Sequence, residues 1–77
     1  MEIIVIASGW VVVGRVVSDG EVVRLEDAKV VRRWGTSHGI GELATGPTPH
    51  TVLDPLGTVA VTASQILFRL AVAVTGW

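Results

Sequence analysis

The sequence contains no cysteine and few charged residues. Without cysteine the 77-residue chain has no disulfide framework, and its two histidines lack thiolate partners for a structural zinc site. A single core gives only marginal stability at this length. Because 49% of the residues are hydrophobic and only 17% are charged, too few polar groups remain to coat a monomer. We therefore expect a homo-oligomer that needs no metal and no cofactor.

The charges nearly cancel, with six basic residues against seven acidic ones and a formal net charge of −1. No overall field exists to attract nucleic acid or an anionic membrane, so we expect no DNA, RNA or membrane partner. Gly14, Arg15, Arg24 and Arg69 interrupt the apolar stretches well short of the roughly 20 residues of a membrane helix. The run from Ile3 to Ala7 is too short for a signal-peptide core. The sequence predicts a soluble cytoplasmic protein.

Valine and isoleucine dominate, and their branched side chains favour strands. We predict one all-β domain over residues 1–77, a small SH3-like barrel or a meander of five to six short strands with one short helical turn. Asp19-Gly20 predicts a hairpin turn, and Gly14 predicts a bulge. Residues 65–73 also fit helical spacing, but we favour a strand. The predicted strands are residues 2–7, 10–18, 21–25, 28–34, 58–62 and 65–75.

The segment between the fourth and fifth predicted strands has a different character. Ser37 is a plausible N-cap for a short helical turn that runs to Ala44. Gly46-Pro47 is expected to stop this turn. The sequence Asp54-Pro55-Leu56-Gly57 predicts a further turn before the next strand.

Catalysis finds little support in the sequence. His38 or His50 can be grouped with Asp54 and Ser37 or Thr48 as a triad, but no nucleophile elbow or oxyanion motif accompanies them. As metal ligands the two histidines lie twelve positions apart, and nothing fixes their geometry. We predict that the protein is not an enzyme.

Ligand binding is the stronger prediction, because eight consecutive residues combine guanidinium groups, an aromatic ring, hydroxyls and glycines. A tryptophan can stack on a base, an arginine can hold a phosphate through two hydrogen bonds, and the amides near Ser37 add a local positive pole. The stiff loop from Gly46 to Thr51 would form the opposite lip. The predicted ligand-binding residues are Arg32, Arg33, Trp34, Gly35, Thr36, Ser37, His38, Thr48 and Thr51.

A purely structural interpretation stays open beside this one. Trp34 can be a core or interface side chain, and the two arginines can pair with Glu26, Asp27 or Glu42 on a solvated face. The glycines can serve turn geometry alone. Trp10 and Trp77 are typical of an interface, and Trp77 could instead cap the end of the barrel.

Several motifs resemble a family of small, mostly uncharacterised phage-encoded β-barrel proteins. The similarity covers about residues 9 to 62. The motifs are Gly9-Trp10 with Gly14, Ala28 with Trp34-Gly35, Gly39-Ile40-Gly41-Glu42-Leu43-Ala44, Gly46-Pro47-Thr48, Leu53-Asp54-Pro55 and Gly57-Thr58-Val59. By analogy of size, oligomery and pocket chemistry, the chain is similar in kind to phage sponges that sequester the cyclic oligonucleotides of CBASS immunity.

Together these features predict a phage anti-defence protein of the host bacterial cytoplasm. It would bind a nucleotide-derived immune signal, a cyclic oligonucleotide, in pockets between subunits and would not cleave it. The alternative is a structural or protein-interaction module of a phage with no small-molecule ligand. A nucleic-acid-binding barrel is poorly supported by the net charge of −1, and an enzyme that degrades a cyclic nucleotide is a further option.

Overall fold

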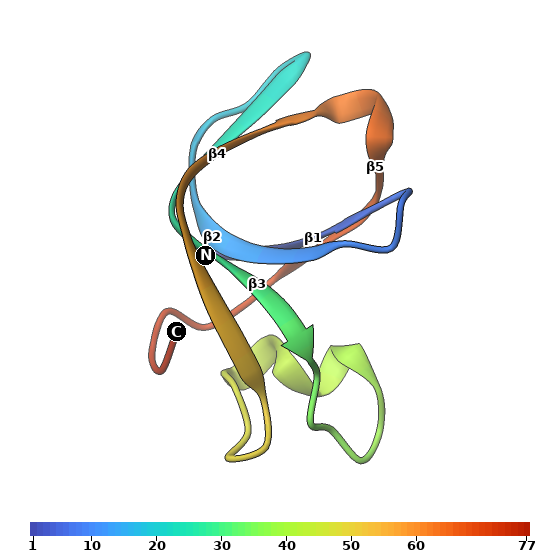
Figure 1. Cartoon of the computed structure of the whole chain (residues 1–77), viewed down its shortest axis with the longest axis vertical. Coiled ribbons are helices and arrows are strands. Elements are labelled where there is room, and N and C mark those ends of the chain that lie inside the picture. The colour runs from blue at the N-terminus through green and yellow to red at the C-terminus, as the bar shows by residue number, and fades with distance from the viewer.

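The chain forms one antiparallel sheet of five strands in a computed structural model that describes all residues 1–77 (Figure 1). The order across the sheet is β4-β3-β2-β1-β5, so each strand up to β4 pairs with the next, and β5 returns to the far side of β1. This confirms the all-β prediction. The elements are β1 (Glu2–Ile6), β2 (Val11–Ser18), β3 (Val22–Arg33), the 3-10 helix η1 (Ile40–Thr45), β4 (Val52–Thr62), the 3-10 helix η2 (Ala63–Gln65) and β5 (Ile66–Ala71).

Five strands form because β3 is continuous where the sequence predicted two strands separated by Glu26-Asp27. The register between β3 and β4 shifts between Leu25 and Ala28, and Asp27 has a positive φ of 51°. A bulge thus absorbs the two acidic residues without ending the strand. The predicted bulge at Gly14 is confirmed by a register shift between Val13 and Arg15.

The turn predicted at Asp54-Pro55-Leu56-Gly57 is wrong, because these residues lie within β4. Lys29 pairs with Pro55 and Ala28 with Gly57, and the register shifts between these pairs. Proline is tolerated because β4 is an edge strand, and Gly57 takes a φ of 84° that suits a bulge. The turn signals therefore bend the strand instead of ending it.

The segment 65–75 is a strand as favoured, but only from Ile66 to Ala71. The short connection before it is the 3-10 helix η2. After β5 the chain leaves the sheet, because the Ala73 amide donates to the Ala44 carbonyl of η1 at 2.7 Å.

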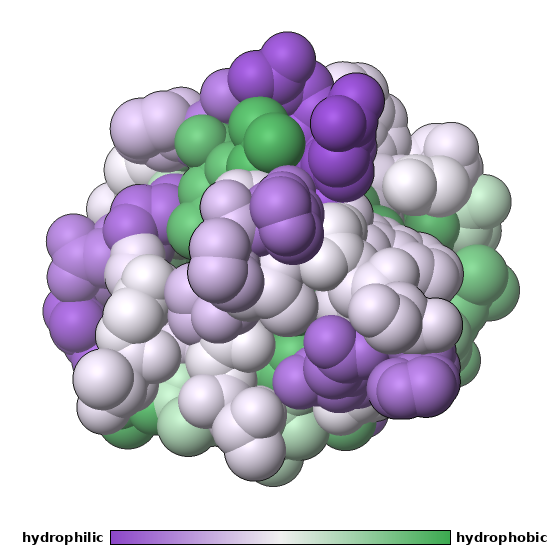
Figure 2. Space-filling view, turned by 90° about the horizontal axis from the view of Figure 1, so that it is seen from below, coloured by the Kyte–Doolittle hydropathy of each residue, from purple (hydrophilic) through white to green (hydrophobic).

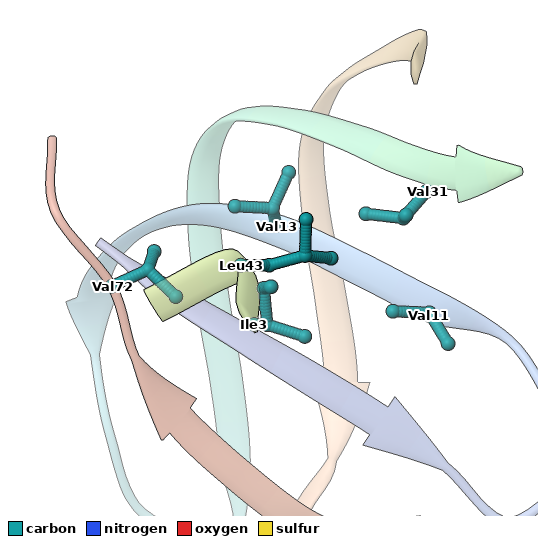
Figure 3. Close-up of a cluster of buried hydrophobic side chains, with 6 residues drawn as sticks. All are labelled: Ile3, Val11, Val13, Val31, Leu43 and Val72. Atoms are coloured by element: carbon teal, nitrogen blue, oxygen red, sulfur yellow. The ribbon is translucent and has the colours of Figure 1, made fainter. Parts of the chain in front are cut away.

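Two hydrophobic clusters lie on opposite faces of the sheet. Ile3 and Ile4 are both fully buried, and alternation along β1 sends one into each cluster. The first cluster (Figure 3) contains Ile3, Val11, Val13, Val31, Leu43 and Val72. The second contains Ile4, Val12, Val23, Leu25, Ala28 and Val61. The central strands are therefore covered on both sides.

The cover over the first cluster comes from η1 and the carboxyl-terminal segment. Leu43 of η1 is fully buried, and Trp77 packs against the same cluster. The segments also touch each other, since a Cβ on Gly46 would lie 3.1 Å from the Thr75 carbonyl oxygen. Trp77 thus covers its own core, although its buried indole nitrogen has no hydrogen-bond partner. No helix in this structure has the length and apolar character to cross a membrane.

An ion cluster joins three distant parts of the chain. The Arg69 guanidinium donates two hydrogen bonds to Glu2 at 2.7 and 2.9 Å and two to Asp19 at 3.0 and 2.9 Å. These contacts tie β5 to β1 and to the turn between β2 and β3. The hydrogen bonds from Arg69 hold the pKa of Asp19 below its usual value, and those from Glu2 and Asp19 raise the pKa of Arg69.

We expect stability to depend on the charge of Asp19. Because the folded-state pKa is lowered, its contribution is present above the ordinary carboxyl pKa of about 4 and is lost as the pH falls through the lower folded value. Thermal unfolding between pH 2 and pH 6 should show a shallower fall for Asp19→Asn than for the parent. Arg69→Gln should also flatten this region, and an unchanged slope in both variants would contradict the assignment.

Candidate functional site

The predicted binding loop, residues 34–51, begins and ends at neighbouring positions because Arg33 of β3 pairs with Val52 of β4. Gly35 turns the chain with a φ of 65°. A Cβ at this position would lie 2.3 Å from the carbonyl carbon of His50 and 2.5 Å from the amide of Thr51. The two ends of the loop therefore touch backbone to backbone, and only glycine fits at position 35.

Two threonines fasten this closure. The Thr51 hydroxyl donates to the Trp34 carbonyl at 2.7 Å, and the Thr48 hydroxyl donates to the Gly35 carbonyl at 2.6 Å. Each hydroxyl also accepts from a backbone amide of the loop, Thr51 from Thr48 at 2.8 Å and Thr48 from His50 at 3.1 Å. Thr48 and Thr51, predicted to contact ligand, therefore hold the base of the loop.

The backbone amides near Ser37, which were predicted to attract an anionic ligand, already bind a carboxylate of the chain itself. The amides of Ser37 and His38 donate to one carboxylate oxygen of Glu42, at 3.1 and 2.9 Å. Ser37 is not the N-cap, since η1 begins after Gly39 and has no side-chain cap. The glycine-rich segment takes an extended path there, with a φ of 95° at Gly39, and the acid from η1 satisfies the amides.

The two arginines have different surroundings because they lie on opposite faces of β3. Arg32 forms a salt bridge with Asp54 of β4 at 2.8 Å. Arg33 has neither a salt bridge nor a side-chain hydrogen bond within the chain. Glu26 and Asp27 do not pair with either arginine, because both bind Arg15, at 3.1 and 2.9 Å.

Trp34 is 41% exposed and belongs to neither core cluster. Its backbone is fixed by Thr51, so the ring projects from a rigid position. Thr36 is half-buried, and the side chains of His38 and His50 are exposed. No three acidic, histidine or cysteine side chains gather closely enough to hold a metal ion.

The loop surface is open. The one hollow in the chain, about 330 Å³, is lined by residues beside the turn between β2 and β3 and around η2. Its lining residues are Glu21, Thr62, Ala63 and Ser64. Seen from the end of the molecule that carries η1, most of the surface is of intermediate hydropathy, with separate hydrophilic patches and smaller apolar areas (Figure 2). The predicted residues are thus gathered on a surface and not around a cavity.

Sequence reasoning missed two features of this region. Glu42 was considered as a partner for arginine, although an acid three positions after Gly39 could have suggested a contact with the loop amides. Arg24 and Lys29 were not singled out, yet they lie on the same face of β3 as Arg33 and the buried Val31, and they also have no acidic partner. Alternation with the buried residues Val23 and Ala28 places both of them there.

No protein-family model, curated protein or solved structure matches this chain. The resemblance to small phage-encoded proteins therefore stays a prediction.

Gly35→Ala should unfold the loop or the whole domain. The substitution adds left-handed strain and a clash with backbone atoms that cannot rotate away, a cost of about 2–4 kcal/mol. For a domain of this size this lowers the Tm by roughly 10–25 °C. Gly41→Ala is the matched control, because nothing lies within 4 Å of its Cβ. Equal Tm values for the two variants would contradict the close approach at Gly35.

Thr51→Val should cost about 1–3 kcal/mol, because the Trp34 carbonyl and the Thr48 amide both lose their partner. Thr51→Ser keeps the hydroxyl and should retain most of the stability. Chemical denaturation of both variants gives the comparison, and a valine variant as stable as the parent would remove the role assigned to this hydroxyl.

Proposed function

We propose that this chain is a non-enzymatic binding protein that captures a nucleotide-derived ligand, such as a cyclic oligonucleotide, and sequesters it without cleavage. The observation that carries the proposal is that Arg33, which has no acidic partner, and the exposed Trp34 are adjacent in the chain where β3 ends and the loop begins. A free guanidinium suits a phosphate, and a tryptophan on a rigid loop suits a base.

The charge arrangement of β3 adds support. Arg24, Lys29 and Arg33 lie on one face of the strand, and none of them has a salt bridge. Most acidic groups, by contrast, are neutralised within the chain, such as Glu2 and Asp19 by Arg69. A chain with a net charge of −1 thus still presents a cationic face, which would attract an anionic ligand at short range.

The rigid base of the loop favours capture over catalysis. Thr48, Thr51 and Gly35 hold Trp34 in place before any ligand arrives, so little conformational entropy is lost on binding. The ligand contacts in this proposal are Arg33, Trp34 and the exposed side chain of His38, with Lys29 as a more distant cation. Removal of an immune signal, the role that the resemblance implies, would follow from such capture.

A second candidate is a protein-interaction module with no small-molecule ligand. It is favoured by the internal bonding of the loop, in which Thr48 and Thr51 bind backbone groups and Glu42 occupies the amides of Ser37 and His38. In that case Trp34 would contact another protein and small ligands would leave the domain unchanged.

A thermal-shift panel of cyclic dinucleotides, cyclic trinucleotides and short oligonucleotides separates the two candidates. A cyclic oligonucleotide at 100 times its Kd should add about 2.7 kcal/mol, which raises the Tm by roughly 10–20 °C. Heat release should return the ligand intact. No shift with any member of the panel would reject the first candidate in favour of the second.

Two pairs of variants locate the site. Trp34→Ala should lose about 1–3 kcal/mol of binding, whereas Trp34→Phe keeps an aromatic face. Arg33→Gln should weaken binding, whereas Arg24→Gln, which removes an equally unpaired arginine from the far end of β3, should weaken it much less because it removes only attraction at a distance. Isothermal titration measures all four, and parent-like binding by Trp34→Ala would exclude the stacking role.

A further inference from the structure

The outer edge of β5 carries unpaired backbone groups. Because the Val72 amide donates to the Met1 carbonyl at 3.1 Å, the antiparallel alternation makes Ile3 with Leu70 and Val5 with Phe68 the hydrogen-bonded pairs to β1. The amides and carbonyls of Arg69 and Ala71 then point away from β1. No strand pairs with this side of β5, which lies at the end of the sheet (Figure 1).

The two edges of the sheet are protected to different degrees. On β4, Pro55 offers no amide, and a bulge with Gly57 bends the strand, which are devices that prevent edge-to-edge association. On β5 there is no proline, and its register shift lies near Ile66, which leaves Phe68 to Ala71 regular. The only charge on β5 is Arg69, and Glu2 and Asp19 already neutralise it.

Exposed apolar side chains gather near the ends of this edge. Leu67 is 65% exposed and Phe68 is 48% exposed. Trp10, 59% exposed, lies at the same end of the sheet but across β1 from β5, because its carbonyl accepts from the Ile6 amide and Ile6 pairs with Ile66 on its other side. Val74, just past the other end of β5, is 73% exposed. These are four of the eight large apolar side chains that the chain leaves exposed.

We propose that the outer edge of β5 is the self-association surface of this protein and that it pairs antiparallel with β5 of a second copy about a two-fold axis. With the axis at Arg69, the outward backbone groups of Arg69 face those of Arg69 in the second copy, and Phe68 faces Leu70 of the second copy. Leu67, at the register shift of β5, lies next to Ala71 of the second copy. The edge is self-complementary, which an isologous dimer requires.

The edge of β5 offers no free charge to a strongly charged partner, because Glu2 and Asp19 already bind its one charged side chain, Arg69. Each cluster holds one cation and two carboxylates, so the two clusters that meet at the axis repel one another, and the apolar contacts around them must exceed this repulsion. A second copy presents the same mainly apolar edge. The surrounding contacts are apolar.

This proposal adds an assembly mode to the proposed function, and it places self-association and ligand binding on different parts of the sheet. It rests on the homo-oligomer expected for a binding protein of this size, but β1 and β2 lie between β5 and the strand that carries Arg33. The two-fold pairing therefore leaves Trp34 open in each copy, in place of a pocket shared between subunits. The resulting dimer presents two binding surfaces.

Sedimentation velocity from about 1 µM to about 500 µM tests the proposal, because small interfaces dissociate in the micromolar range. The parent should reach twice the 8.1 kDa mass of one chain. Leu67→Lys buries an unpaired charge at the interface and should raise the dissociation constant about 100-fold or more. Ala71→Pro removes an outward amide that β1 does not use and should act in the same direction.

Leu56→Lys is the matched control, since Leu56 is 46% exposed on the opposite edge strand and the variant should sediment as the parent does. Leu67→Lys should keep the circular dichroism of the parent, and it decides the result if Ala71→Pro fails to fold. A monomeric parent, a dimer that tolerates Leu67→Lys, or a larger assembly that Leu56→Lys also disrupts would each overturn the proposal. The thermal-shift panel, repeated with Leu67→Lys, tests separately whether the protein that no longer dimerises still binds a ligand.

Discussion

The whole structure depends on the burial of β1 and β2 from both sides. Ile3 and Ile4 are neighbours in the sequence, and each is fully enclosed by a different cluster. A five-stranded sheet curled on itself can enclose only one of these faces. The other face needs a separate cover, which η1 and the carboxyl-terminal segment supply through Leu43, Val72 and Trp77. A chain of this length therefore supports two small cores back to back.

This constraint explains the internal bonding of the loop that carries η1. A segment that must lie over a core has to satisfy its own polar groups, since water is excluded from one side of it. Glu42, Thr48 and Thr51 perform this task for the backbone from Trp34 to His38. The side chains that this loop does not use for its own bonding remain free to contact a ligand, chiefly Arg33, Trp34 and the histidines.

The sequence predicted the secondary-structure elements much better than the contacts between side chains. Branched residues, Asp19-Gly20 and Gly14 predicted the strands, one hairpin and one bulge, because these signals act locally. Glu26-Asp27 and Asp54 to Gly57 were interpreted as breaks, yet pairing with neighbouring strands kept both segments in the sheet. The contacts of Glu42 and of Arg32 with Asp54 depend on register and on the path of η1, which residue spacing alone does not give. The same holds for the threonines, whose hydroxyls look alike whether they bind a ligand or a carbonyl.

The position of β5 beside β1 also determines how the chain can fold. Glu2 pairs with Ala71, and Arg69 reaches back over 67 residues to Glu2, so one side of β1 acquires its partner only when nearly the whole chain has been brought into a closed loop. Loop-closure entropy opposes this step before any contact rewards it. Such non-local pairing is typical of small barrels that fold in milliseconds to seconds, not microseconds. The bonds from Arg69 to Glu2 and Asp19 join the two ends of the chain once this long loop has closed.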